Sequence, residues 1–206
     1  VFGSDRGLCG AFQAVLQAAT EQEIGRTSTP EELTVIGRLT RDRLIRAGLP
    51  VDRFYSQPEL KNQGPDIAAW AEAIWASWSS DRYRSLDLIY IEYISGGRQV
   101  ARTQRLLPVE KPGESPEAGD YLRAGFDPDP DSILRQLTPL YLQTALTWAY
   151  LNSWVSEQAI RFVGMSRAAE NAKSMIEDLQ RLYNRQRQDS ITLEIADLMN
   201  PRPAEK

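Results

Sequence analysis

The residues of this sequence that could do chemistry lie first in a glycine-rich loop near its start. The loop consists of Ser4, Asp5, Arg6, Gly7, Leu8, Cys9 and Gly10. Backbone amides where such a loop enters a helix can hold a phosphate group. However, the loop matches neither the G-x-G-x-x-G nor the G-x-x-x-x-G-K-[ST] pattern, and no lysine directly follows it. We therefore interpret its glycines as residues that let the chain turn tightly into the next helix.

The sequence lacks most of the residues that usually carry out nucleophilic or metal-dependent catalysis. The sequence has no histidine and a single cysteine, Cys9. Although Cys9 lies near a predicted helix N-terminus, which would favour its thiolate, neither a base nor a second thiol accompanies it. Asp127, Asp129 and Asp131 alternate as calcium ligands can, but prolines fill the gaps and no EF-hand glycine or distal glutamate follows. We interpret them as an acidic N-cap and expect no catalytic residue, metal or cofactor.

The overall composition is that of an ordinary globular protein of one or two domains. The 206 residues are 42% hydrophobic and 25% charged, with a net charge of −4. This charge gives no basic field for nucleic acid. No apolar run approaches the ~20 residues of a membrane span, and no signal peptide is evident. Because Val1 to Ser4 read as the inside of a strand, we expect the sequence to begin part-way through a protein.

Short strand and helix patterns alternate over residues 1–125. We expect strands at 1–4, 33–37, 51–56, 86–93 and 99–107, and helices at 11–24, 40–47 and 66–83. Gly96 and Gly97 are typical of a hairpin turn between the last two strands. The alternation predicts an α/β fold, a mostly parallel Rossmann-like sheet with helices on both faces and an antiparallel strand at one edge.

The last third of the chain, from Ser132 to Met199, is typical of one very long helix. Its apolar seam advances in alternating steps of three and four residues. The seam comprises Leu137, Tyr141, Thr144, Trp148, Leu151, Val155, Gln158, Phe162, Met165, Ala169, Ala172, Ile176, Leu179, Tyr183 and Gln186. A sustained seven-residue repeat predicts a left-handed coiled coil. At 1.5 Å per residue the helix would span about 100 Å.

Such a helix requires a second helix beside it. Trp148, Trp154, Phe162 and Leu179 would otherwise lie bare in water. No other segment of this chain is long enough to cover them. We therefore divide the chain into an α/β domain at 1–125, a coiled-coil helix at 126–200 and a tail at 201–206. An ordinary helix lying across a globular core is the alternative interpretation.

Two blocks together resemble the gamma subunit of the F-type ATP synthase. The loop at 4–10 matches that family's SDRGLCG at every position. Along the long helix, 156–161, 183–188 and 191–195 resemble the family's SEQAAR, YNKARQ and ITxEI segments in the same order and spacing. Residues 106–108 also resemble its LLP step. The resemblance covers both ends of the chain and the architecture between them.

This resemblance implies a central rotor shaft that couples H⁺ or Na⁺ flow through a membrane ring to ATP synthesis or hydrolysis in an alpha-beta hexamer. It implies the alpha and beta subunits, the epsilon subunit and the membrane c-ring as partners. It also implies that the partner helix is the protein's own N-terminal helix, absent from this chain. The expected location is peripheral, on the cytoplasmic face of a bacterial inner membrane, with no direct insertion and no nucleic acid.

The resemblance further implies which residues contact the hexamer or tune coupling. By position these are Arg161, Arg187, Gln188, Thr192 and Glu194. Arginine suits paired contacts with carboxylates, and Gln and Thr suit bonds that are exchanged on turning. Departures at Gly164, Ser166, Arg167 and Asp189, and a tail after Met199 in which Pro201 should end the helix, favour a divergent gamma subunit, such as one from an alternative or ion-specialised synthase.

Two other classes of function remain open at this stage. One is a stand-alone α/β nucleotide-binding protein with a dimerising helix, which tight binding of a nucleotide by this chain would support. The other is a coiled-coil scaffold that self-associates through the seam. The missing histidine and the incomplete glycine pattern argue against the nucleotide-binding class.

Overall fold

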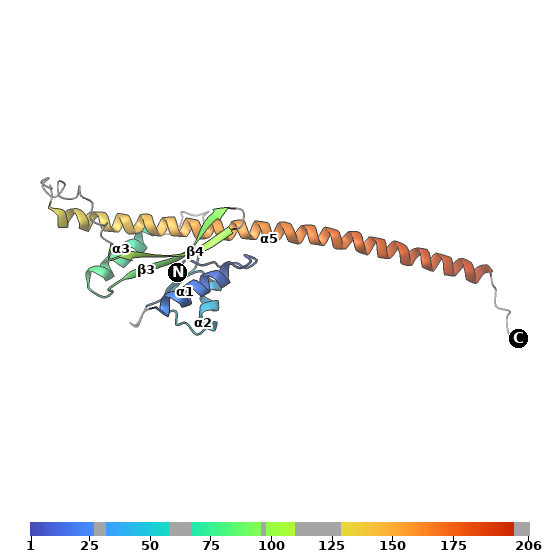
Figure 1. Ribbon diagram of the computed structural model, residues 1–206, viewed down its shortest axis with the longest axis horizontal. Coiled ribbons are helices and arrows are strands. Elements are labelled where there is room, and N and C mark those ends of the chain that lie inside the picture. The colour runs from blue at the N-terminus through green and yellow to red at the C-terminus, as the bar shows by residue number, and fades with distance from the viewer. Residues whose placement is uncertain (27–31, 58–66, 96–97, 110–128, 200–206) are drawn as a thin grey trace. The chain divides into compact units, whose positions relative to one another are not determined.

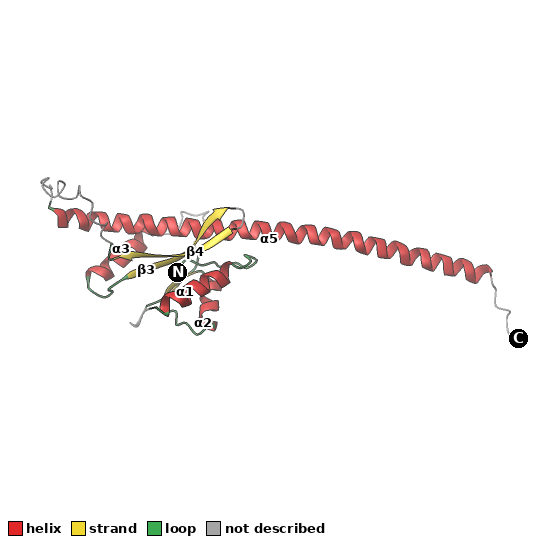
Figure 2. Ribbon diagram, viewed as in Figure 1, coloured by secondary structure: helices red, strands yellow, loops and turns green. Residues whose placement is uncertain are grey.

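The computed structural model describes residues 1–26, 32–57, 67–95, 98–109 and 129–199, and all structural statements below concern these residues. Helices and strands alternate along the first part of the chain, and one long helix follows (Figures 1 and 2). The elements are α1 (Phe12–Ile24), β1 (Thr34–Ile36), α2 (Arg38–Arg46), β2 (Arg53–Tyr55), α3 (Ile67–Ser79), β3 (Leu86–Ser95), β4 (Arg98–Leu107) and α5 (Pro130–Met199).

The strands form one parallel and one antiparallel pair, which the N-terminal segment connects. β1 pairs in parallel with β2, and β3 pairs antiparallel with β4. Between them, Phe2 forms a parallel bridge with Ile36, and its N–H donates to the carbonyl of Ile89 at 2.9 Å. The predicted α/β fold, with a parallel sheet and an antiparallel strand at its edge, is confirmed.

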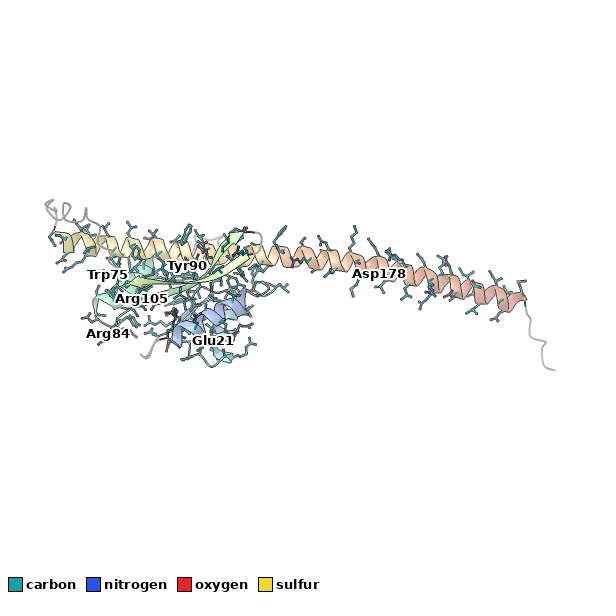
Figure 3. The ribbon with its side chains drawn as sticks, in the orientation of Figure 1. Glu21, Trp75, Arg84, Tyr90, Arg105 and Asp178 are labelled. Atoms are coloured by element: carbon teal, nitrogen blue, oxygen red, sulfur yellow. The ribbon has the colours of Figure 1, made fainter. Side chains whose placement is uncertain are left out.

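Successive residues of β3 face opposite sides of the sheet, as the strand period of two requires. Leu88 and Tyr90 belong to a buried cluster that also receives α3 and α5. Ile89 and Ile91 belong to a second cluster, with α1. Figure 3 labels Tyr90 and Trp75, which both contribute to the first cluster. Helices therefore cover both faces of this sheet, as predicted.

Element boundaries differ from the sequence expectation by a few residues. α2 begins two residues earlier than predicted, directly after Gly37, and α3 ends at Ser79 rather than near Tyr83. Asp81 takes a positive φ of 53°, which turns the chain away from the helix. The predicted start of α3 at Asp66, the Gly96-Gly97 turn and the tail at 201–206 lie outside the described residues.

The helix α5 runs from Pro130 to Met199. Asp129 caps its start, because its carboxylate accepts hydrogen bonds from the N–H and hydroxyl of Ser132 at 3.0 and 2.6 Å. These bonds lower the pKa of Asp129. The acidic N-cap prediction is thus confirmed for Asp129. Pro139 lies inside the helix, where it cannot donate to the carbonyl four residues earlier.

The structure divides into two compact units, Val1–Arg161 and Phe162–Lys206. In the first, α5 buries Leu142, Leu146, Ala149 and Tyr150. In the second, every described residue after Val163 is exposed. Trp154, expected to lie bare, is instead half-buried. The predicted division at 125/126 lies outside the described residues and remains a prediction, and the two compact units divide within α5.

Candidate functional site

The glycine-rich loop at 4–10 is fixed by hydrogen bonds among its own residues and α1. Ser4 is buried, and its hydroxyl donates to the Arg6 carbonyl at 3.1 Å and accepts from the Gln13 side chain at 2.6 Å. At the loop's tip, Leu8 has a positive φ of 63° and an exposed fraction of 76%. The start of the loop is therefore held by hydrogen bonds, whereas its tip is exposed to solvent.

Asp5 connects this loop to two other segments. One carboxylate oxygen accepts the N–H of Arg38, the first residue of α2. The other accepts the N–H of Gln57 at 2.9 Å, just after β2. Because Gly37 has no side chain to cap α2, Asp5 satisfies the free amide from a distant part of the chain.

The glycines of this region allow close backbone approach. Gly10 has a φ of 52°, and a Cβ built on it would lie 3.1 Å from Cγ2 of Ile160 on α5. Gly37 has a φ of 109°, and its Cβ would lie 2.5 Å from the backbone nitrogen of Ser4. These positions agree with the interpretation of the loop as a tight turn rather than a phosphate cradle.

Cys9 is buried, with an exposed fraction of 3%. Its sulfur lies 3.8 Å from the Arg6 carbonyl oxygen. Burial raises the pKa of the Cys9 thiol, and the hydrogen bond with Ser4 opposes this only in part. The expectation that a nearby helix N-terminus would favour the thiolate is therefore wrong for this residue, because desolvation dominates.

Beyond its apolar contacts with the sheet, α5 presents a polar face toward the domain. Ser153 accepts the N–H of Ile91 at 3.0 Å and donates its hydroxyl to the carbonyl of Phe2 at 3.2 Å. Ser156 donates to the carbonyl of Ile91 at 3.4 Å. Both serines are buried. Residues three apart lie on one helix face, so the two hydroxyls meet the same strand.

Glu157 and Arg161 continue this face one turn further. The Glu157 side chain has an exposed fraction of 1%, and it forms an ion pair with Arg161, whose side chain is 15% exposed. Glu157 also accepts from the Gln57 side chain at 2.9 Å. Arg161 donates through Nε to the Gly7 carbonyl at 3.3 Å and through another nitrogen to Gln158 at 2.9 Å. The buried carboxylate is thus paired and hydrogen-bonded, as burial of a charge requires.

We call the polar contacts of Ser153, Ser156, Glu157 and Arg161 with the domain the polar junction. The other predicted interface residues lie apart from it. Arg187, Gln188, Thr192 and Glu194 are all exposed on α5 within Phe162–Met199. A spacing of seven places Arg187 and Glu194 on one face of the helix, two turns apart, and a spacing of four places Gln188 and Thr192 one turn apart. The Thr192 hydroxyl donates to the Gln188 carbonyl at 2.8 Å. Figure 3 labels Asp178, which lies on the same exposed part of α5.

Sequence reasoning missed the residues that complete the junction. Gln57, Ser153, Ser156 and Glu157 received no individual role. The sequence does hint at three of them, because Ser153, Ser156 and Glu157 recur at helical spacing on a helix face that is otherwise apolar. Nothing in the sequence places Gln57 beside them, because its partner Glu157 lies 100 residues away.

In the described part of the chain, no group of three or more His, Cys, Asp or Glu side chains could hold a metal ion. None of the described helices combines the length and the hydropathy needed to cross a bilayer.

Comparison with known proteins gives consistent matches over nearly the whole chain. The family model described as ATP synthase matches residues 1–201. An ATP synthase gamma chain of Moorella thermoacetica is 32% identical over 200 residues, covering 95% of this chain and 68% of that protein. One from Chloroflexus aurantiacus is 34% identical over 205 residues, covering 94% and 67%.

Solved structures share the fold at low sequence identity. A chain in the OSCP/F1/c-ring structure of the Euglena gracilis mitochondrial ATP synthase aligns with a TM-score of 0.67 at 14% identity, covering 96% of this chain and 69% of that one. A chain in the central stalk and c-ring structure of the Tetrahymena thermophila mitochondrial ATP synthase gives 0.62 at 22%, covering 82% and 74%.

Proposed function

Because this chain belongs to the ATP synthase gamma-chain family, we propose that it is the central rotor shaft of an F-type ATP synthase. In this role, ion flow turns a membrane ring and the shaft turns with it. The asymmetric faces of the shaft then drive the catalytic sites of an alpha-beta hexamer through different affinities, and the chain itself does no bond chemistry.

The observation that carries this proposal is the long exposed end of α5. From Gly164 to Met199 every residue is exposed, and large apolar side chains such as Ile176, Leu179 and Tyr183 continue the seam. A single helix with this surface requires other protein around it. A shaft that pairs with a second helix and turns inside a ring of subunits provides that surrounding.

The proposal includes specific partners and a location. The exposed end of α5 would contact the alpha and beta subunits, and the α/β domain would contact the epsilon subunit and the membrane c-ring. A helix from the same gene product would cover the seam. We place the protein peripherally on the cytoplasmic face of a bacterial inner membrane.

Within the shaft, we propose Arg187, Gln188, Thr192 and Glu194 as residues that contact the hexamer. Their side chains are exposed in this chain, so they are available to a partner. Arg187 could pair with a carboxylate, and such charge-assisted bonds are roughly twice as strong as neutral ones. Arg161 belongs to the same group by resemblance, and we propose that it tunes coupling.

The test is reconstitution of the full-length product with its own alpha and beta subunits, followed by measurement of ATP hydrolysis. We expect the shaft to stimulate hydrolysis and the double variant Arg187→Ala, Gln188→Ala to reduce this stimulation about tenfold, because charge-assisted bonds are lost. Arg181→Ala is the matched control, since Arg181 is also exposed on α5. Failure of the wild-type product to associate with the hexamer would contradict the proposal.

A further inference from the structure

The contacts between α5 and the α/β domain change in character along the helix. From Leu142 to Tyr150 the buried residues of α5 are apolar. From Ser153 onward they are Ser153, Ser156 and Glu157. The apolar contacts keep one face of the helix against the sheet. Hydrogen bonds are directional, so they define its rotation about its axis more sharply.

The polar contacts of α5 reach four separate segments of the domain. Ser153 bonds to Phe2 in the N-terminal segment and to Ile91 in β3. Glu157 bonds to Gln57, just after β2, and Arg161 bonds to Gly7 in the glycine-rich loop. Because these segments differ in position, no single movement of the helix preserves all four contacts. We call the set formed by Gln57, Glu157, Arg161 and the Gly7 carbonyl the clamp.

Rotation of α5 by one residue position would turn these groups by about 100°. The ion pair between Glu157 and Arg161 lies within the helix and would turn with it, but Gln57 would lose Glu157 and the Gly7 carbonyl would lose Arg161. Because buried polar groups without partners are costly, these two bonds favour one rotational position of α5 over its neighbours. A shaft must transmit torque between its domain and its helix, and torque is what would rotate α5 against the sheet.

We propose that Glu157 is a positioning residue that locks the rotation of α5 against the α/β domain, so that torque passes between them through the clamp. This inference rests on the proposed rotor function and deepens it. It also assigns Arg161 a different mode of action from that of Arg187. Arg161 influences coupling by holding Glu157 and the Gly7 carbonyl, rather than by contacting the hexamer.

The test uses the complete synthase in vesicles, with full-length product carrying Glu157→Gln. ATP hydrolysis and ATP-driven ion uptake are measured in parallel, with H⁺ and Na⁺ each supplied. The substitution keeps the size of the side chain but removes the charge that holds Arg161 toward the Gly7 carbonyl and that strengthens the bond from Gln57. Weakening of these two bonds between α5 and the domain raises the population of a rotated helix by about tenfold or more. We expect hydrolysis to continue and the ions transported per ATP to fall.

A second readout separates the lock from a purely structural role. In single complexes with a probe on the α/β domain, we expect wider angular fluctuation in Glu157→Gln than in wild type. Glu92→Gln is the matched control, because it also breaks an ion pair, with Arg102 across β3 and β4, but that pair is partly exposed and does not involve α5. It should retain wild-type coupling and wild-type fluctuation.

The outcomes distinguish the two levels of inference. If wild-type product does not assemble with the hexamer, the rotor function fails and the lock fails with it. If wild type couples but Glu157→Gln only lowers the yield of assembled complexes, leaving ions per ATP and angular fluctuation unchanged, the lock is overturned and the rotor function stands. Should Glu157→Gln not assemble, Gln57→Ala removes one neutral donor from the clamp, and unchanged coupling in that variant overturns the proposal.

Discussion

At the scale of single residues, Gly37 shows how tightly the glycine-rich loop is held. Its φ of 109° is a conformation that L side chains rarely adopt, and an added Cβ would lie 2.5 Å from the Ser4 nitrogen and 2.8 Å from the Gly3 carbonyl carbon. Both atoms belong to the backbone, so neither can move aside as a flexible side chain could. The base of the loop and the start of α2 are therefore built around the absence of a side chain here.

We predict that Gly37→Ala destabilises the protein by about 3 kcal/mol or more, because backbone strain and a steric clash add together. Gly48→Ala is the matched control: its φ is 84°, but nothing lies within 4 Å of the added Cβ. That variant should lose only about 1–2 kcal/mol from its unfavourable backbone conformation. Urea unfolding of the purified chain measures both. Equal losses would show that the close approach at Ser4 contributes nothing.

At the scale of elements, hydrophobic periodicity predicted most helices and strands to within a few residues. The alternation of strand and helix patterns predicted helices on both faces of the sheet, and α1 and α5 cover opposite faces of β3. The polar junction could not be predicted in the same way. Glu157 reads as an ordinary helical glutamate until the fold brings Gln57 and the loop beside it. Likewise, Arg161 was predicted to be an interface residue by resemblance alone, and the sequence did not show its contacts with Glu157 and the Gly7 carbonyl.

The helix α5 carries a local conflict at Pro139, where the seven-residue repeat favours a helix and the proline disfavours it. Because proline lacks an N–H, the carbonyl of Arg135 loses its helical donor. We predict that Pro139→Ala stabilises the protein by up to about 3 kcal/mol. Pro130→Ala should be nearly neutral, since Pro130 is the first residue of α5, where proline is tolerated. Thermal unfolding of the two variants provides the comparison, and an unstable Pro139→Ala would mean that the proline rigidifies this segment usefully.

At the scale of the whole molecule, the two compact units place different demands on one helix. Within Val1–Arg161, α5 is held by a buried apolar face and by the clamp. Within Phe162–Lys206, its described residues are exposed almost throughout and include the proposed contacts with the hexamer. A rotor needs both properties, because torque must be received by one unit and delivered by the other. The unit that delivers it requires a second helix for stability in water.

This requirement gives a prediction about the full-length gene product. On a Cys9→Ala background, Ile176→Cys places a thiol on the seam, and Ser174→Cys places one about 160° away on the opposite face. Both positions are exposed in the present chain, so a soluble alkylating reagent should modify them at similar rates. In the full-length product we expect slow alkylation at position 176 and unchanged alkylation at 174, because a paired helix covers only the seam. Equal rates of alkylation in the full-length product would mean that its own helix does not cover the seam. Slow alkylation at position 176 would then have to appear only when the alpha and beta subunits are added.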